Sequence, residues 1–238
     1  MAVTFSTSVN LTAATTTNSK ATLSVGGSNT TIIAAIGISS ATAVVSSGSW
    51  SLGGTASLVS SSRSAGNVLV SIWAVPAPTG GSGTYTAGYS ASAESVGVIA
   101  CYTGADQTSP AVSADAVTSV SVSSNINLVP NNLTASDASE LFASNTVTGN
   151  WTSTTPSQIS SSNASNPGWI AGRATGVTGV HEFNDGTCTT NDVMIMAVRI
   201  KAAAAGGTAL RMITPAPLDV GSGNRFFGNR VMKELVLG

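Results

Sequence analysis

The stretch from Ala43 to Pro110 constrains the fold of this chain more than any other part. Short runs of alternating apolar and polar residues follow one another there, separated by turn residues and a few aromatic residues. Alternation with a period of two is typical of strands that bury one face. Helical periodicity is nearly absent from the chain. The pattern predicts an all-β, antiparallel sandwich that is built for contact and has no reaction centre.

Similar runs recur on both sides of this stretch, with Gly, Asn, Ser or Pro between them. We expect strands at residues 3–9, 21–25, 30–38, 43–52, 55–61, 67–75, 84–90, 95–103, 117–123, 141–147 and 192–201. The strand at 30–38 is apolar on both faces, which predicts a central strand covered on both sides. Two other strands carry faces that should point inward, formed by Tyr85, Ala87 and Tyr89 and by Met194, Met196, Val198 and Ile200.

Composition limits the class of protein. The chain has 238 residues, of which 8% are charged and 42% are hydrophobic. This length fits one large β domain, or one domain with an appendage. The hydrophobic fraction is enough for a core, so the chain is not expected to be disordered. A surface of hydroxyls, amides and small apolar groups repels neighbouring copies only weakly, which suits a protein that packs against others.

The few charges are unevenly placed. Residues 1–172 carry two basic and five acidic side chains, whereas residues 173–238 carry seven basic and five acidic ones. A nucleic-acid binder normally shows a basic stripe that neutralises many phosphates. The basic residues here are too few for such a stripe, so we expect no nucleic-acid partner.

Neither targeting segments nor cysteines define the class or the fold of this protein. Residues 1–10 lack the basic start and apolar run of a signal peptide, and no run approaches the length of a membrane helix, so we expect no membrane association. The two cysteines, Cys101 and Cys188, could pair only if the fold brings them close. A buried free thiol is the favoured interpretation of Cys101.

Several segments resemble a known family. They are Trp50–Gly54, Ser62-Arg63, Val70–Pro76, Gly83–Thr86, Val96–Pro110 and the closing strand Val193–Ile200. In these pieces the chain is similar to a jelly-roll-like sandwich domain found in bacteriophage virion proteins and as repeats in secreted bacterial proteins. The resemblance covers about residues 30–201. The chain departs from the family pattern between Asn125 and Gly168, where the spacing is long and rich in Ser and Asn.

The sequence divides into three regions on this interpretation. Residues 1–29 form an N-terminal strand or arm region, residues 30–206 the sandwich, and residues 207–238 an extended C-terminal arm. Pro215, Pro217 and several glycines prevent a long regular element in the arm. Its apolar side chains seek a surface, either on the same chain or on a neighbour. The candidate partner-binding residues are Arg211, Arg225, Phe226, Phe227, Arg230, Met232, Leu235 and Leu237.

The sequence offers few candidates for catalytic or metal-binding residues. His181 lies near Glu182, Asp185 and Asp192, but a single histidine without ligand spacing does not predict a metal site. No serine lies in a nucleophile elbow, so we expect no catalytic residue and no cofactor. Asp106 is expected to shape the turn before Pro110 through backbone hydrogen bonds. The glycines of residues 80–83 are expected to form a hairpin connection.

The tryptophans divide into two pairs. Trp50 and Trp73 lie in strand patterns and are expected to fill the core. Trp151 and Trp169 lie in the irregular Ser- and Asn-rich region, and we expect them to be the better exposed pair. They are the candidates for glycan stacking or for an interface.

Two functions from different classes follow from these observations. The first is a virion structural protein, a decoration or cement subunit on the capsid surface that binds the major capsid protein through its arm. Self-association is expected of such a subunit, and the family resemblance implies a homotrimer. The alternative is a tail-fibre or cell-surface adhesion module that binds a glycan or a protein receptor. Fold alone does not decide between them.

Overall fold

The structure is a computed structural model of the chain. It describes residues 1–64, 67–119, 125–128, 134–145, 151–155, 157–162, 169–175, 181–185 and 193–204. The chain divides into two units, Met1–Ala205 and Gly206–Gly238, and the second lies outside the described residues. We call the first unit the body. No helix capable of crossing a membrane occurs in the described part of the chain.

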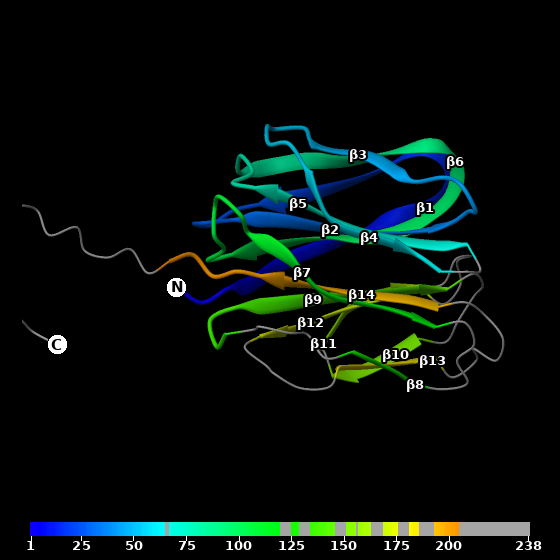
Figure 1. Cartoon of the computed structure of the whole chain (residues 1–238). Coiled ribbons are helices and arrows are strands. Elements are labelled where there is room, and N and C mark those ends of the chain that lie inside the picture. Colours follow the sequence, from blue (N-terminus) through cyan, green and yellow to red (C-terminus); the bar gives the residue numbers. More distant parts are fainter. Residues whose placement is uncertain are drawn as a thin grey trace, which may run out of the picture. The chain divides into compact units, whose positions relative to one another are not determined.

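The body is built from antiparallel strands (Figure 1). The strands are β1 (Thr4–Val25), β2 (Thr31–Ser39), β3 (Val45–Trp50), β4 (Ser57–Arg63), β5 (Val68–Pro76), β6 (Gly81–Thr103), β7 (Ala111–Ser119), β8 (Asn125–Leu128), β9 (Ala138–Asn145), β10 (Trp151–Thr155), β11 (Ser157–Ser162), β12 (Trp169–Thr175), β13 (His181–Asp185) and β14 (Val193–Ile200).

Two of the sheets form a sandwich. The six-stranded sheet has the order β1-β6-β2-β5-β4, with β3 paired to β6, and the five-stranded sheet has the order β11-β12-β9-β14-β7. Strand β4 packs over β7, β5 over β14 and β9, and β6 over β12. A three-stranded sheet, β10-β13-β8, contacts the five-stranded sheet through β8 and β10. The predicted all-β antiparallel sandwich is therefore confirmed.

Strand β2 occupies the centre, as its two apolar faces predict. It pairs with β5 on one side and with β6 on the other over its whole length. Ile32, Ala34, Ile36 and Ile38 enter one hydrophobic cluster, which we call the first core. Ile33 and Ala35 enter another cluster, the second core, on the opposite face. A strand of this kind needs protein on both sides because neither face can be left in water.

The first core is enclosed by strands of one sheet. Strand β6 carries Tyr85, Ala87 and Tyr89 into it from its first half and Ile99 and Cys101 from its second half. Between the register pairs Thr16↔Ala93 and Asn18↔Gly88, four residues of β6 lie opposite Thr17 of β1. This irregularity bends the β1–β6 ribbon, so that β3 and the first half of β6 lie over β2 and β5 (Figure 1).

The long strands differ from the prediction. Separate strands were expected at 3–9 and 21–25 and at 84–90 and 95–103, but β1 and β6 each run without interruption. The middle of β1 is a polar run of Thr, Asn and Ser, which carries no apolar alternation to signal a strand. Pairing with β6 keeps it extended across three register shifts. Pairing with β6 therefore accounts for a strand that the local sequence does not predict.

The expected hairpin at residues 80–83 is wrong. Strands β5 and β6 are not neighbours, because β2 lies between them in the sheet. Gly81 and Gly83 instead begin β6, where they pair with Val25 and Leu23 of β1. A Cβ atom at Gly83 would lie 2.4 Å from the ring of Trp50. Glycine is therefore needed here for close packing under an aromatic ring.

The second core joins the two sheets of the sandwich. The six-stranded sheet supplies Val70, Ile72, Val98 and Tyr102 among others, and the five-stranded sheet supplies Phe142 and Trp169 together with the predicted inward face of β14. Met194, Met196, Val198 and Ile200 are all buried, which confirms that prediction. Ile195 and Ala197 on the other face of β14 are buried as well. Strand β14 is therefore covered on both sides, like β2.

Between residues 125 and 185 the sequence prediction missed most strands. Only the strand expected at 141–147 has a counterpart, β9, which begins earlier, at Ala138. Strands β8, β10, β11, β12 and β13 are four to seven residues long, and β10 and β11 consist largely of Ser and Thr. Strands this short carry too few positions for apolar alternation to be visible.

Gly97 tests how tightly the central strands pack. A Cβ atom there would lie 2.3 Å from the carbonyl oxygen of Ala35 in β2, whereas a Cβ atom at Gly26 would meet nothing within 4 Å. We predict that Gly97→Ala lowers the free energy of unfolding by about 1–3 kcal/mol, because the backbone must move apart. Gly26→Ala should stay within about 0.5 kcal/mol of the wild type. Equal denaturation midpoints for the two variants would contradict this packing.

Candidate functional site

The predicted partner-binding residues of the C-terminal arm all lie outside the described residues. This holds for Arg211, Arg225, Phe226, Phe227, Arg230, Met232, Leu235 and Leu237. The structure does describe the chain up to residue 204, which is the base from which the arm continues. The geometry of this base decides whether the arm starts from a fixed point.

The base is fixed by backbone hydrogen bonds. After β14 ends, residues 201–203 lie along residues 104–110, and we call them the exit segment. The Lys201 N–H donates to the Pro110 carbonyl at 2.8 Å, and the Ala203 N–H donates to the Gly104 carbonyl at 2.8 Å. The Asp106 N–H donates to the Lys201 carbonyl at 2.9 Å. The exit segment is thus held as a short added strand, with a β-bridge between Ala105 and Ala202.

Asp137 holds the exit segment from the other side. Its Oδ1 accepts the Ala202 N–H at 2.9 Å, and its Oδ2 accepts the Arg199 Nε–H at 2.9 Å. The second guanidinium nitrogen of Arg199 lies 2.8 Å from the same oxygen. The backbone and hydroxyl of Thr134 also donate to Oδ2. One carboxylate therefore ties the start of β9 to the end of β14 and to the exit segment.

The pKa of Asp137 reflects these contacts. Burial raises it, but the hydrogen bonds from Ala202 and Thr134 and the charge of Arg199 outweigh burial, so the pKa lies below the ordinary aspartate value. The folded state therefore favours the ionised form. The resulting stabilisation is present above the pKa of an unfolded aspartate and is lost as the pH falls through the folded value.

The N-terminus lies at the same place. The Met1 ammonium donates to the Ala203 carbonyl at 3.4 Å, and the Val3 N–H donates to the Ser136 carbonyl at 2.8 Å. Asp106 shapes the adjoining turn, because its Oδ1 accepts the N–H groups of Thr108 and Ser109 at 2.8 Å each. The turn predicted for Asp106 is confirmed. These contacts, led by the bond from Ser109, lower the pKa of Asp106.

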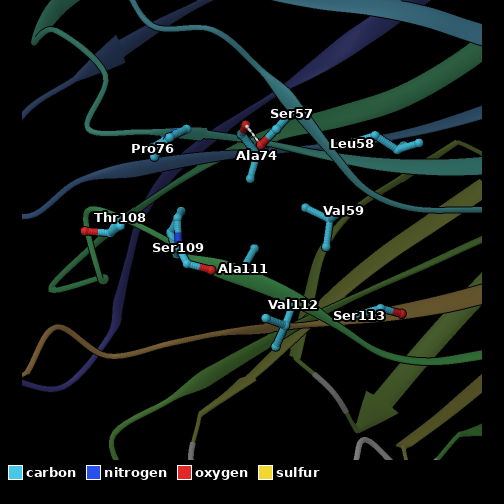
Figure 2. A pocket seen from close by; sticks show the side chains of 11 residues that line it. Ser57, Leu58, Val59, Ala74, Pro76, Thr108, Ser109, Ala111, Val112 and Ser113 are labelled. Atoms are coloured by element: carbon cyan, nitrogen blue, oxygen red, sulfur yellow. Dashed lines mark hydrogen bonds between the residues drawn. The ribbon is translucent and has the colours of Figure 1, made fainter.

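A groove beside this base was missed by sequence reasoning. It has a volume of about 300 Å³ and lies between β4 and the segment from Thr108 to Ser113, which leads into β7. Figure 2 shows Val59, Ala74 and Ala111 pointing toward one another across it. Strands β4 and β7 are each an edge strand of their sheet in the described part of the chain. None of the lining residues is charged, and Leu58 (52% exposed) and Val112 (36% exposed) flank the opening.

The tryptophans match the prediction only in part. Trp50 and Trp73 are buried, as expected, and Trp50 Nε1–H donates to the Thr79 carbonyl at 3.1 Å. The expectation that Trp169 is exposed is wrong, because it is 2% exposed and stacks on Phe142 with ring centroids 5.8 Å apart. Trp169 starts β12 and pairs with Ser144 of β9, which turns it into the second core. The side chain of Trp151 lies outside the description.

Of the remaining chemical candidates, the structure describes the side chain of Cys101 but not those of Cys188 and His181. Cys101 is a buried free thiol, as favoured, and burial raises its pKa to about 11, whereas Cys188 lies outside the described residues. The same is true of the His181 side chain. Among the side chains that are described, no group of three or more His, Cys, Asp or Glu could hold a metal ion.

Sequence reasoning also missed a buried acid. Glu140 in β9 is fully buried, and the Tyr102 hydroxyl donates to its Oε2 at 2.8 Å. The available signal was its position before Leu141 and Phe142 in an apolar run, where an acidic side chain is unusual.

Comparison with protein-family models, with curated proteins and with solved structures finds no match to this chain.

We predict that Asp137→Asn lowers the free energy of unfolding by about 2–4 kcal/mol at neutral pH. The amide leaves Arg199 without its anionic partner, and its NH2 group faces N–H and O–H donors that the carboxylate accepted. Asp106→Asn is the matched control, since an asparagine keeps the turn, and it should cost less than about 1 kcal/mol. Thermal melts across pH check this. The difference between Asp137→Asn and the wild type should shrink as the pH falls below about 4, and a difference that is independent of pH would contradict the ionic role.

Proposed function

We propose that this chain is a capsid decoration or cement subunit of a virus particle, which self-associates and binds the major capsid protein through its C-terminal arm. The observation that carries the proposal is the fixed exit segment, held by Asp137 and by residues 104–110. An arm that starts from a rigid base delivers its apolar side chains to a defined place on a neighbour. In this proposal the body fixes the start of the arm, and the apolar side chains of the arm bind the capsid protein.

The low surface charge of the body supports a location where many copies pack close together. Of the ten acidic residues in the chain, Asp137 and Glu140 are buried in the body and contribute no surface charge that could repel a neighbour. The exposed positions of β3 and the first strands are mostly Ser, Thr and Gly. Such surfaces can approach one another without bringing like charges together. Close packing around a shell requires this property.

The arm acts by burying apolar surface. Removing about 500 Å² of apolar surface from water contributes at most about 12 kcal/mol at roughly 25 cal/mol per Å². Ordering the arm offsets much of this gain. Arg211, Arg225 and Arg230 add cations that pair with acidic groups on a capsid surface. Repetition around the particle multiplies a modest contribution from each copy.

The groove between β4 and β7 supports self-association. Free sheet edges are templates for added strands, and here two of them flank an uncharged hollow. Leu58 and Val112 are two of the five exposed large apolar side chains among the described residues. We propose that copies meet at this groove. Three copies is the number that the family resemblance implies.

The adhesion alternative keeps less support. One of its two aromatic candidates, Trp169, is buried in the second core and cannot stack on a sugar in the folded body. Retention of the protein on a glycan array, lost in Trp151→Ala, would favour adhesion over decoration.

We predict that Phe226→Ser with Phe227→Ser reduces binding to capsids by at least about tenfold, because two large apolar contacts are lost. The measurement is co-sedimentation of full-length protein with particles of the parent virus prepared without it. Leu52→Ser is the control, since Leu52 is a large apolar residue of the body that is 39% exposed. It should bind like the wild type. If the double variant binds particles as fully as the wild type does, the arm does not mediate capsid binding.

We predict that Leu58→Asp shifts the full-length protein toward the monomer, because it places a carboxylate at the rim of the groove in every copy. Analytical ultracentrifugation over a range of concentrations measures this, with Leu52→Asp as the matched control. A self-association constant that Leu58→Asp leaves unchanged would remove the groove from the interface. A protein that is monomeric at all concentrations would contradict self-association itself.

A further inference from the structure

Glu140 is an acid placed where the two sheets of the sandwich meet. Its side chain points from β9 into the second core, and the Tyr102 hydroxyl of β6 satisfies Oε2 at 2.8 Å. Its other carboxyl oxygen, Oε1, has no hydrogen-bond partner among the residues that the structure describes. A fully buried carboxyl with one free oxygen is a costly feature of a core, and it is most costly when charged.

A cation lies beside this acid but is turned toward another partner. Arg173 of β12 is the register neighbour of Glu140 in the five-stranded sheet. Its guanidinium carbon lies 4.4 Å from the centroid of the Phe5 ring, a cation–π contact. The Phe5 ring in turn meets the Tyr102 ring edge to face, with centroids 5.7 Å apart. Arg173, Phe5, Tyr102 and Glu140 thus form one connected series of contacts.

A bulge brings Phe5 into this series. The register of β1 on β6 shifts between Phe5 and Thr7, so Ser6 is an extra residue. The side chains beyond the shift, such as Leu11, enter the first core, whereas Phe5 packs against the second core. The contact of Phe5 with Arg173 therefore joins the N-terminal strand of one sheet to β12 of the other.

Among the described side chains of β2, β5, β6 and β14, none competes with Arg173 for a charge on Glu140. Strands β2 and β5, which pack against β9, contain no titratable residue. Strand β14 contributes Arg199, which is paired with Asp137. From β6, Tyr102 faces Glu140, whereas Cys101 enters the first core. Among these strands, Arg173 is the cation placed to answer a charge on Glu140.

Burial favours the neutral acid. It raises the pKa of the Glu140 carboxyl to about 8, and the hydrogen bond from Tyr102 offsets part of that rise. The acid is therefore neutral in the folded body at neutral pH and ionises in mildly alkaline solution. In the neutral state the acid carries no charge that would draw Arg173 away from Phe5.

We propose that Glu140 is a proton-operated latch that decides whether Arg173 fastens the N-terminal strand to the five-stranded sheet. With the carboxyl neutral, Arg173 stays on the Phe5 ring. When the carboxyl O–H bond breaks and its proton passes to water, the negatively charged carboxylate attracts the guanidinium of Arg173. Arg173 then pairs with Glu140 and leaves Phe5 without its cation.

The two events are coupled, and the coupling gives the test its direction. Pairing with Arg173 favours the ionised acid, whereas the Phe5 ring competes for the same guanidinium. Removing the cation should therefore raise the pH at which Glu140 ionises, and removing the ring should lower it. A carboxyl that only filled space in the core would show neither change.

Carbon-13 NMR of full-length protein labelled at the glutamate carboxyl carbon follows this directly. The chain has only four glutamates, and Glu140→Gln identifies the signal of interest by its loss. We expect the Glu140 carboxyl to titrate near pH 8. The δ protons of Arg173, shifted upfield by the Phe5 ring, should move toward ordinary values with the same midpoint. Phe5→Leu, which has no ring, gives the reference position for those protons.

Two variants then separate the latch from simple burial. Arg173→Gln should raise the midpoint of the Glu140 titration by about half a pH unit or more, and Phe5→Leu should lower it by about half a unit. The proposal is overturned if the wild-type carboxyl titrates near the ordinary glutamate value. It is equally overturned if the Arg173 signals do not respond to pH between 6 and 10, a result that needs no variant to fold.

Discussion

Strand β2 has no polar face, and the rest of the body is arranged to cover both of its sides. Ile32, Ile36 and Ile38 require one layer, and Ile33 with Ala35 requires another. The first layer comes from the same sheet, because the β1–β6 ribbon bends back over β2. The second comes from the five-stranded sheet. Burying both faces of one strand thus fixes the arrangement of the strands that supply the two cores.

The base of the C-terminal arm depends on the same constraint. Strand β14 is buried on both faces in the five-stranded sheet, so its last residue, Ile200, is held by the core. The backbone bonds of residues 104–110 and the carboxylate of Asp137 then fix the next three residues. Packing positions the end of the strand and polar contacts continue it. In the cement function that we propose, this base would direct the arm, and the same core contains Glu140, the acid of the proposed latch.

Predictions from the sequence were correct where a residue's own pattern determined its environment. The two apolar faces of residues 30–38, the inward Tyr85 face and the turn at Asp106 are all of this kind. They failed where a partner distant in sequence decided the outcome. The polar middle of β1 is a strand because β6 lies beside it, Trp169 is buried because β9 pairs with β12, and Glu140 is tolerated because Tyr102 reaches it. None of these partners is visible in local periodicity.

Because β2 and β6 contribute to both cores, we expect the two layers of the body to unfold together. If β2 and β6 bind both cores together, neither layer can open while the other stays folded. Native-state hydrogen exchange across increasing denaturant measures this. Amides of Tyr85–Tyr89 around the first core and of Met194–Val198 in β14 should converge on one free energy of exchange, that of global unfolding. Convergence of either group at a distinctly lower value, with the other still protected, would show that β2 does not couple the two layers.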